Sequence, residues 1–534
     1  MVVTTWIGGS GDWNTAADWS NGVPTAADDA VFAHSVSGYG TDTVTGNGPA
    51  ASLSILAPGG DQSFAGTHAV GAFVDENYGR LLGGGAIGFG AATISGGGQL
   101  DVRAGAGFGS GPLTLDFGLL TLQSVVLSSP ITLVSSGSVA GKTGTLAGLI
   151  SGTGELHLGD DVVLANPGNI YSGGTAIGMG DVYGPDRSDL GHVEIGAGTA
   201  AGSGPIGLGS GTLTLDPGAI VGPISAAFGR FDPAEIDASD QSATVFVGRK
   251  GLVYNNGSGH PTIVGASGPG PGPGYGYGDG QPSIFGSMTI QGGTGSITVF
   301  GGDEGGVFHG GSAGNNLLFG GADLTGFPPV EDGGYLQDGS AYSPGPVTMF
   351  GGGDGDFLVA GGTDNSYASA ASKANVLVAA GGRETLTGSG STGRNVFFGG
   401  SGADVIAAGA GASTVIAGIG IATISGGAGA AAIFAGAGSA VVLGGGGADY
   451  VQAGAGNATL FAGAGMDIVG VVSGQAGGSL VVSGFRAGID RVSAQGYAAG
   501  PVVASGGGST VLTFSDQTRV TLLGVASLPG GVAS

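Results

Sequence analysis

The sequence predicts an all-β chain that winds into a solenoid: a parallel β-helix, then a β-roll, then a C-terminal β cap. Glycine accounts for 125 of the 534 residues, far above the usual share of about 7%, yet 41% of residues are apolar and can form a core. Short runs of Val, Ile, Leu, Thr and Phe alternate with glycine turns, which favours strands over helices. A nine-residue repeat also runs without interruption through residues 399–470, and internal repeats are the signature of solenoids.

The charge balance narrows the range of partners. The chain carries 13 Lys and Arg against 38 Asp and Glu, a net charge of −25. Nucleic acids and anionic membrane surfaces attract clustered cations, which this sequence lacks, so we predict no nucleic-acid partner. No stretch of about 18 continuous apolar residues occurs, so we also predict no membrane insertion. The absence of cysteine excludes disulfides and thiolate metal sites, whereas the excess of carboxylates suits divalent cations.

The first predicted domain, residues 1–228, begins with the three tryptophans of the chain, Trp6, Trp13 and Trp19. An open first coil would expose the core of a solenoid to water, so we interpret these large side chains as a cap. The alternative is a platform on which sugar rings stack, which would make a cell-surface polysaccharide a partner.

Residues 140–216 of this domain contain the patterns L-x-G-x-I-S-G-T-G-x-L, N-x-Y-S-G-G-T (Asn169 to Thr175) and G-T-L-T-L. These patterns resemble the passenger repeats of autotransporter proteins, and the resemblance implies a parallel β-helix. The membrane barrel of that family has no counterpart in the C-terminal segment, so the resemblance extends to the β-helix alone. Residues 229–285 are then a connecting segment, in which the alternating Pro and Gly of 266–283 predict a linker or an exposed loop.

The third predicted domain, residues 286–470, contains the nonapeptide array. Eight consecutive repeats fill 399–470, each with Gly at its second and fourth positions and with Val, Ile or Leu at its eighth. Glycine permits tight turns, and we expect the eighth position to enter the core. Two nonapeptides should form one coil, so that residues 18 apart stack on the same side of the solenoid.

The array resembles the G-G-x-G-x-D-x-U-x repeat of RTX (hemolysin-type) proteins, in which stacked turns bind calcium. The resemblance implies Ca²⁺ as a cofactor, held by backbone carbonyls and by the acid at the sixth position. Only three of the eight repeats keep that acid, as Asp404, Asp449 and Asp467. Asp449 and Asp467 are 18 residues apart and form the best pair, whereas Asp404 faces Ala422 and would make half a site.

Degenerate repeats upstream supply two further candidate ligands. The segment 351–359 places Asp354 and Asp356 in the calcium-loop pattern, with Asp354 in place of the usual fourth-position glycine. Residues that precede apolar triplets in the same manner are Asn315, Asn316, Asn375 and Asn395. The alternative to calcium is a solenoid without metal that retains a few aspartates.

The last predicted domain, residues 471–534, is a C-terminal cap. Its G-F-x-x-G-x-D-x-V segment (Gly484 to Val492) and its S-D-x-T-x-V-T-L-x-G-V segment (Ser515 to Val525) resemble the part that closes RTX exoproteins. The resemblance implies type I secretion by an uncleaved C-terminal signal, hence an extracellular or bacterial cell-surface location. It also implies a chain that folds outside the cell as calcium binds. We expect Asp490 to be a turn residue and the segment 511–522 to form a capping hairpin.

No catalytic constellation emerges from the sequence, so we predict that the chain is not an enzyme. The six histidines are scattered without a metal-binding spacing. Asp160 and Asp161 would suit a polysaccharide-degrading β-helix. However, no basic residue lies near them in sequence, and a solvated turn is the simpler interpretation.

We therefore expect a secreted, self-assembling structural protein stabilised by calcium: a filament, a surface-layer subunit or a biofilm-matrix adhesin. Few charges and two solenoid regions favour self-association, because unpaired strand edges at coil ends promote head-to-tail stacking. The alternative is an extracellular polysaccharide-degrading enzyme built on residues 1–228. A pore-forming RTX toxin is disfavoured, since such toxins carry a long apolar helical region that this sequence lacks.

Overall fold

The structure confirms the predicted fold class. Strand accounts for 53% of the chain and helix for 1%, in a parallel β-solenoid. The one helical element among the described residues is the short turn η1 (Ala16–Asp18), and none of them forms a helix long and apolar enough to cross a membrane. This computed structural model describes residues 2–528 apart from 34–40, 57–60, 65–66, 76–79, 84–85, 104–109, 160, 179–191, 210, 227–233, 248–250, 266–286, 302–305, 321–346, 353–355, 360–365, 370–374, 380 and 389–390.

The chain divides into two compact units, residues 1–253 and 254–534, which we call unit 1 and unit 2. Unit 1 coils first between two parallel sheets, and a third sheet joins them at Val126. The first sheet contains β1 (Val3–Thr5), β3 (Asp29–Phe32), β5 (Gly48–Ile55), β7 (Thr67–Asp75), β9 (Ala86–Ser95), β11 (Leu113–Asp116), β14 (Ile131–Leu133) and β17 (Ile150–Gly152).

The first sheet ends at β17, and the later coils of unit 1 use the second and third sheets. In unit 1 the second sheet contains β2 (Gly11–Asp12), β4 (Thr41–Thr45), β6 (Asp61–Phe64), β8 (Arg80–Gly83), β10 (Gln99–Arg103), β12 (Gly118–Gln123), β15 (Ser136–Lys142), β18 (Glu155–Leu158), β20 (Thr175–Ile177), β22 (Ile206–Leu208), β24 (Ile224–Ala226) and β26 (Thr244–Val247). The third sheet contains β13 (Val126–Leu127), β16 (Gly144–Leu146), β19 (Val162–Leu164), β21 (His192–Ile195), β23 (Gly211–Leu215) and β25 (Ala234–Ala238).

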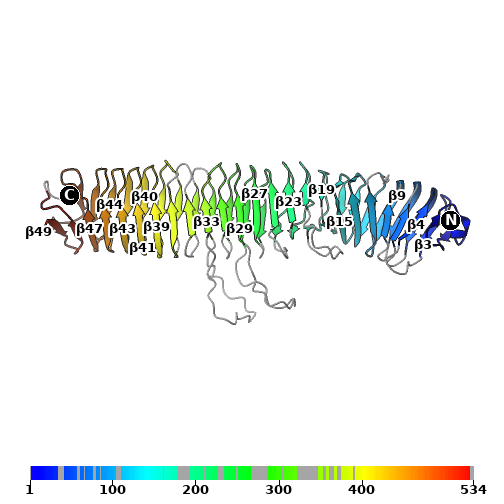
Figure 1. Cartoon of the computed structure of the whole chain (residues 1–534), viewed down its shortest axis with the longest axis horizontal. Coiled ribbons are helices and arrows are strands. Elements are labelled where there is room, and N and C mark those ends of the chain that lie inside the picture. Colours follow the sequence, from blue (N-terminus) through cyan, green and yellow to red (C-terminus); the bar gives the residue numbers. More distant parts are fainter. Residues whose placement is uncertain are drawn as a thin grey trace, which may run out of the picture. The chain divides into compact units, whose positions relative to one another are not determined.

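Unit 2 has two parallel sheets, whose strands alternate along the chain (Figure 1). We keep the names second and third sheet for them. The second sheet contains β28 (Thr262–Val264), β30 (Thr298–Phe300), β32 (Leu317–Phe319), β34 (Phe357–Val359), β36 (Val376–Val378), β38 (Val396–Phe398), β40 (Ser413–Ile416), β42 (Ala431–Phe434), β44 (Tyr450–Gln452), β46 (Ile468–Val472) and β48 (Arg491–Gln495). The third sheet contains β27 (Leu252–Asn256), within which the two units divide, and then β29 (Met288–Gln291), β31 (Gly306–His309), β33 (Val347–Phe350), β35 (Ser366–Ser369), β37 (Glu384–Thr387), β39 (Ala403–Ala407), β41 (Ile421–Ser425), β43 (Ser439–Leu443), β45 (Ala458–Phe461) and β47 (Ser479–Ser483).

The nonapeptide array forms the regular part of unit 2, as its period predicts. Ala403 pairs with Ile421, and Ile421 pairs with Ser439, so one coil takes two nonapeptides. The eighth position of every repeat enters the core, and each of these eight side chains is at most 1% exposed: Ile406, Val415, Ile424, Ile433, Val442, Val451, Leu460 and Val469. The sixth position is buried as well, whether Asp, Ser or Ala occupies it. The sixth and eighth positions of the repeat therefore both face the interior, where first-position alanines such as Ala417 and Ala453 are buried as well.

The invariant fourth-position glycine is required because neighbouring turns lie close together. A Cβ on Gly447 would lie 2.3 Å from the carbonyl oxygen of Gly429, one coil earlier. At Gly446, the third position of the same repeat, a Cβ would come no closer than 3.8 Å to another residue. This difference explains why the third position accepts Ser, Ala and Ile along the array, whereas the fourth is always glycine.

The N-terminal end of unit 1 carries the predicted tryptophan cap. Trp6, Trp13 and Trp19 are at most 3% exposed, and Trp19 packs edge-on against the other two at centroid distances of 5.0 and 4.9 Å. The segment that follows them also covers the outer edge of β1. The carbonyl of Thr5 accepts the Ser20 N–H at 2.9 Å, and the carbonyl of Val3 accepts the Asn21 side chain at 2.7 Å. The first strand is therefore not an open edge.

The C-terminal end of unit 2 is closed by the predicted hairpin. Strand β51 (Arg519–Leu522) pairs in parallel with β47, and β50 (Ser509–Thr513) pairs antiparallel with β51. A further strand, β49 (Val502–Gly506), pairs antiparallel with β50, and all five of its residues are exposed. The C-terminal end thus presents one solvent-exposed strand, unlike the covered N-terminal end.

The segment predicted to connect the two solenoids itself contains strands. Within 229–285, β25 and β26 belong to unit 1, and β28 belongs to unit 2. Pairs such as Leu213 with Ile236, and Ile224 with Val245, show that β25 and β26 continue the parallel ladders of unit 1. The Pro- and Gly-rich stretch 266–283 lies outside the described residues.

Candidate functional site: a buried polar column

A column of buried polar side chains follows one edge of the second sheet in unit 2. Each member directly precedes a strand of that sheet, so the strand register stacks them one coil apart. Each is at most 4% exposed. The members of this polar column are Asn316, Asp356, Asn375, Asn395, Asp449, Asp467 and Asp490. Ser413 and Ala431 stand at the two intervening positions.

Among the described residues, the hydrogen bonds that join successive coils along the polar column run in the same direction, from an N–H of the earlier coil to a side-chain oxygen of the later coil. In the amide part, Oδ1 of Asn395 accepts the Asn375 N–H at 3.1 Å, and Oδ1 of Asn375 accepts the Asp356 N–H at 2.9 Å. Oδ1 of Asp356 in turn accepts both the main-chain N–H and the Nδ2 group of Asn316, at 2.9 and 2.8 Å. Each side chain therefore binds the backbone of the preceding coil, where strand pairing alone would leave a buried N–H without a partner.

The aspartate part repeats the same geometry with carboxyl oxygens as acceptors. Oδ1 of Asp467 accepts the Asp449 N–H at 3.2 Å, and Oδ1 of Asp449 accepts the Ala431 N–H at 2.9 Å. Their Oδ2 atoms accept the N–H of the second-position glycine of their own repeats, Gly463 at 2.8 Å and Gly445 at 2.9 Å. Asp449 and Asp467 therefore stack as their spacing predicts, and each bridges two successive coils.

The protonation of Asp449 reflects this environment. Burial raises the pKa of its carboxyl above the ordinary value. The two N–H groups that it accepts act in the opposite direction, and the negative charge of Asp467 raises the pKa further. The ionised form of Asp449 is thus disfavoured relative to an exposed aspartate.

The column ends at Asp490 with the only cation that pairs with it among the described residues. Oδ1 of Asp490 accepts the Asp467 N–H at 3.0 Å and Nη2 of Arg486 at 2.9 Å. Oδ2 accepts the Arg486 N–H at 2.7 Å and Nε of the same residue at 3.2 Å. Burial alone would raise the pKa of Asp490, but the hydrogen bonds from Arg486 and from the main chain outweigh it and lower the pKa.

Arg486 also joins the cap to the preceding turn. Its Nη1 donates to the carbonyl of Ala464 at 2.8 Å, and its Nη2 donates to the carbonyl of Gly465. Arg486 occupies the place in its turn that glycine takes in the nonapeptides, since its N–H bonds Asp490 just as Gly463 bonds Asp467. The guanidinium thus supplies a positive charge and several donors where the last acidic side chain and two turn carbonyls converge.

Asp404 belongs to the third sheet and lies apart from the polar column. It precedes Val405, which pairs with Thr385, so its neighbour one coil earlier is Glu384. Asp404 is 2% exposed and Glu384 is 1% exposed. Oδ2 of Asp404 accepts the Gly400 N–H at 2.7 Å, whereas its Oδ1 accepts no hydrogen bond from the described residues. One oxygen of the Asp404 carboxyl group therefore accepts a hydrogen bond from the described residues and the other does not. Its acidic neighbour, Glu384, lies one coil earlier.

The other sequence-predicted residues are placed as follows. Asp356 is a member of the polar column, and Asp354 lies outside the described residues. Of the pair considered for catalysis, Asp161 is exposed and Asp160 lies outside the described residues. The polysaccharide-degrading alternative therefore stays a prediction, which a carbohydrate-cleavage screen with both aspartates replaced would test.

The surroundings of Asp449 and Asp467 do not fit a calcium cage. Calcium takes six to eight oxygen ligands at about 2.3–2.6 Å. Here the two carboxylates face main-chain N–H groups, whose partial charge is positive. Across the described residues, no three His, Asp or Glu side chains gather closely enough to hold a metal ion. These two aspartates act as hydrogen-bond acceptors in this geometry, and calcium binding by the chain stays a prediction.

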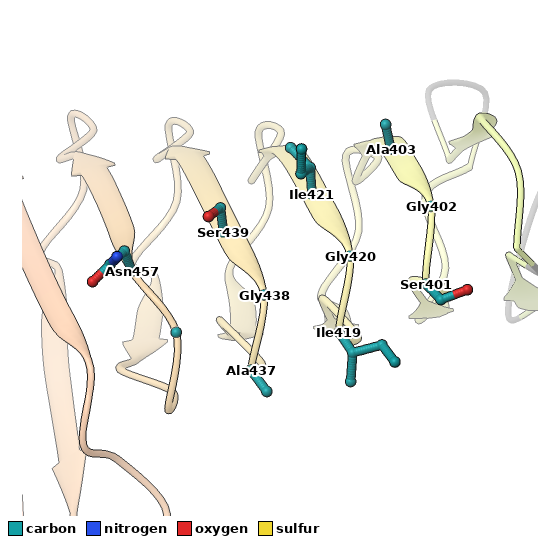
Figure 2. A pocket seen from close by; sticks show the side chains of 11 residues that line it. Ser401, Gly402, Ala403, Ile419, Gly420, Ile421, Ala437, Gly438, Ser439 and Asn457 are labelled. Atoms are coloured by element: carbon teal, nitrogen blue, oxygen red, sulfur yellow. The ribbon is translucent and has the colours of Figure 1, made fainter.

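A shallow groove of about 420 Å³ lies where the turns enter the third sheet (Figure 2). Figure 2 shows Ser401, Ile419 and Ala437 at equivalent places on successive coils, each followed on its own coil by a glycine that also lines the groove. None of the residues that line the groove is acidic or basic. The groove therefore offers van der Waals contact and hydroxyl or amide hydrogen bonds, but no group for acid–base chemistry.

The sequence patterns indicate neither Arg486 nor Glu384. Asp490 closes the turn 486–490, as expected of a turn residue, and it also accepts the Asp467 N–H, which the sequence patterns do not indicate. The signal that could have found Asp490 is its place directly before a strand of the second sheet, which Asp449 and Asp467 share. No nine-residue spacing leads to it, because 23 residues separate it from Asp467.

No protein-family model, curated protein or solved structure matches this chain.

Proposed function

We propose that this protein is a secreted structural protein that assembles with copies of itself at the bacterial cell surface or in the extracellular matrix. The observation that carries the proposal is the use of the buried polar groups. In the polar column, carboxylate and amide oxygens bind the backbone of the neighbouring coil, so the ionisable side chains of the interior stabilise the stack of coils. Such a molecule is suited to a mechanical or scaffolding role.

The exposed surface of unit 2 supports the same proposal. Its described acidic residues between 254 and 470 are each at most 2% exposed: Asp356, Glu384, Asp404, Asp449 and Asp467. The groove at the turns also lacks charged side chains. Catalytic sites in clefts generally contain ionisable groups in contact with solvent, whereas a packing surface does not need them.

The two ends of the chain argue against simple head-to-tail pairing of strands. Such stacking needs an open strand edge at each end, and the outer edge of β1 is covered by residues 19–22. Among the described residues, the fully exposed strand at an end of the solenoid is β49, at the C-terminal end. Assembly in this proposal therefore relies on side surfaces of the solenoid rather than on continuous backbone pairing.

Electron microscopy and sedimentation velocity of the purified full chain test the proposal. We expect filaments, sheets or concentration-dependent oligomers. A protein that stays monomeric at every concentration, with calcium and with a chelator, would contradict the structural role.

Calcium enters the proposal as a separate prediction, located at Glu384 and Asp404. The motivation is the buried Oδ1 of Asp404, which accepts no hydrogen bond from the described residues beside a second acid one coil away. Calorimetric titration with Ca²⁺ alone should show binding that Asp404→Asn weakens and that the matched variant Asp449→Asn leaves unchanged. An identical, heat-free titration for all three proteins would remove calcium from the proposal.

A further inference from the structure

The second sheet of unit 2 presents an apolar surface on its outward side. In β28 through β42 the middle residue of each strand triplet points into the core, and the residues on either side of it are partly exposed. The parallel register aligns these flanking residues into two columns. One column contains Thr262, Thr298, Leu317, Phe357, Val376, Val396, Thr414 and Ala432. The other contains Val264, Phe300, Phe319, Val359, Val378, Phe398, Ile416 and Phe434. We call these two columns the apolar face.

Aromatic side chains give the apolar face a rigid surface. Phe300 and Phe398 are 41% and 37% exposed. The rings of Phe300 and Phe319 stack at a centroid distance of 5.2 Å and an interplanar angle of 4°. Phe357 meets Phe319 edge-on at 6.0 Å. Rigid aromatic rings form contacts at low entropic cost, which is why they are enriched where proteins meet.

The apolar face carries no charge, unlike the chain as a whole. None of its sixteen residues is ionisable, and the described acidic residues of the surrounding coils are buried. Arg394 is exposed two residues before Val396, so it lies at the rim. With a net charge of −25, two copies of the chain repel each other over most approaches. Among the described residues between 254 and 470 no carboxylate is exposed, so contact through the apolar face brings no described carboxylate of one copy against those of another.

Its dimensions suit a contact between two copies. Eight strands at a spacing of about 4.8 Å give a length of about 35 Å, and two outward columns with their side chains give a width of about 15 Å. Face-to-face contact would then bury about 500 Å² on each copy and about 1,000 Å² in total, near the lower bound for a specific interface. Beyond the second sheet, Ile419 in the turn after β40 is 71% exposed, and Ile421 at the start of β41 in the third sheet is 62% exposed.

We infer that the apolar face is the site at which two copies of this chain associate laterally, with the second sheets of their unit 2 regions packed face to face. A single contact of this size is weak, so association should depend on protein concentration. This inference rests on the proposed structural role, for which it names the partner and the surface. It places the contact on the side of the solenoid, in agreement with the covered N-terminal edge.

The test compares two double variants of the full chain that add the same charge to opposite sheets. Phe300→Asp/Phe398→Asp changes the apolar face, in β30 and β38. The matched control, Val307→Asp/Val405→Asp, changes outward residues of the adjacent third-sheet strands β31 and β39, which are 37% and 48% exposed. Circular dichroism first establishes that both variants retain the strand signal. Sedimentation velocity over a wide concentration range then compares them with the unmodified chain.

We expect the unmodified chain and the third-sheet control to associate, and the apolar-face variant to stay monomeric at the same concentrations. Association that persists in the apolar-face variant overturns the inference while the structural role stands. Equal loss of association in both double variants also overturns the inference, because added charge on either sheet would then be enough to prevent association. A third variant, Val503→Asp, places the charge on β49, where Val503 is 55% exposed. Loss of association confined to this variant would assign the contact to β49 and overturn the inference.

Two further outcomes separate the inference from the function on which it rests. If the unmodified chain shows no assembly by sedimentation or by electron microscopy, the structural role itself fails. If it is monomeric but co-sediments with insoluble cellulose, and Phe300→Asp/Phe398→Asp abolishes that binding, the apolar face binds a polysaccharide and the inference of a second copy is wrong.

Discussion

The outward second-sheet surfaces of the two units differ in kind, although the same alternation of inward and outward residues produces both. In unit 1 the outward positions of β10 to β18 include Gln99, Gln123, Lys142, Glu155 and His157, and the last two lie 3.0 Å apart. In unit 2 the corresponding positions of β28 to β42 form the apolar face. The central inward positions of these strands are apolar in both units, for example Leu156 in β18 and Val415 in β40, so the solenoid constrains the inward column more than the outward one. A specialised surface is therefore to be sought in the outward column.

The two units also differ in how they close and stack their coils. Unit 1 ends in a cluster of aromatic rings, and its strands shift between three sheets. Unit 2 repeats a coil of two nonapeptides and stacks polar side chains along one edge. Aromatic packing stabilises through buried area, whereas the polar column stabilises through directional hydrogen bonds that need an exact register. Aromatic packing tolerates an irregular sequence. The polar column instead requires that the strand register place an acceptor side chain at the same position of successive coils, whatever the length of each coil.

The largest expected effect is loss of the aromatic cap of unit 1. Trp13 is fully buried and packs against Trp19 at 4.9 Å and His68 at 4.8 Å. Trp13→Ala should destabilise the first coils by about 3–5 kcal/mol, because it leaves a cavity that the neighbouring rings cannot fill. Hydrogen exchange should then show faster exchange in β1 to β6, with unit 2 unchanged. Phe246→Ala, at a residue that is 47% exposed in the same unit, is the control and should change little. Equal effects of both variants would contradict the cap.

A smaller effect is expected from a single methyl group in the regular coils of unit 2. Gly447→Ala brings a Cβ to within 2.3 Å of the Gly429 carbonyl oxygen and should cost about 1–3 kcal/mol, by overpacking the turn. Gly446→Ala, one residue earlier, meets nothing closer than 3.8 Å and should change stability by less than about 0.5 kcal/mol. Urea unfolding of the two variants measures the difference. Similar midpoints would mean that the turns of unit 2 are looser than their spacing indicates.

The smallest effect concerns the pH dependence of the polar column. The folded-state pKa of Asp449 is raised, so its unfolded form loses its proton first and stability falls as pH rises between the two pKa values. The folded-state pKa of Asp490 is lowered, so its ionised side chain adds to the free energy of unfolding above the unfolded-state pKa of about 3.9. This contribution is lost as pH falls through the folded-state pKa. Relative to the unmodified chain, Asp449→Asn should therefore lose less free energy of unfolding at pH 7 than at pH 3.

Asp490→Asn is the matched counterpart and should show the opposite trend, with a larger loss of stability at pH 7 than at pH 3. Urea unfolding at the two pH values measures both variants. If the free energy of unfolding of the two variants changed with pH in the same way, Asp449 and Asp490 would not differ in their titration. Arg486 would then not lower the pKa of Asp490 in particular.

Much of the core could be predicted because it depends on local spacing. The eighth position of the nonapeptides is apolar in every repeat, and an inward column is the one arrangement that keeps all eight side chains from water. The stacking of Asp449 on Asp467 followed from the same period. The tryptophan cap could be predicted because three large apolar side chains at one end of a solenoid have few other places to pack.

The role of the aspartates could not be predicted from their spacing. The RTX-like repeat suggested oxygen ligands around a calcium ion, whereas the described geometry surrounds Asp449 and Asp467 with N–H donors. A period fixes which residues stack, but not whether carbonyl oxygens or N–H groups turn toward a side chain. That choice depends on the backbone conformation of the turns.

The sequence by itself determined that this chain is a β-solenoid, which residues enter its core, and that each regular coil takes two nonapeptides, since these follow from composition and period. Only the tertiary structure decided which side chains share a column across coils of unequal length. Asp356 lies 40 residues from Asn316 and Asp490 lies 23 residues from Asp467, yet each bonds its neighbour's backbone. Insertions between strands change the count of residues without changing the register, because parallel hydrogen bonding aligns strands rather than sequence positions. The polar column and the apolar face both result from that alignment.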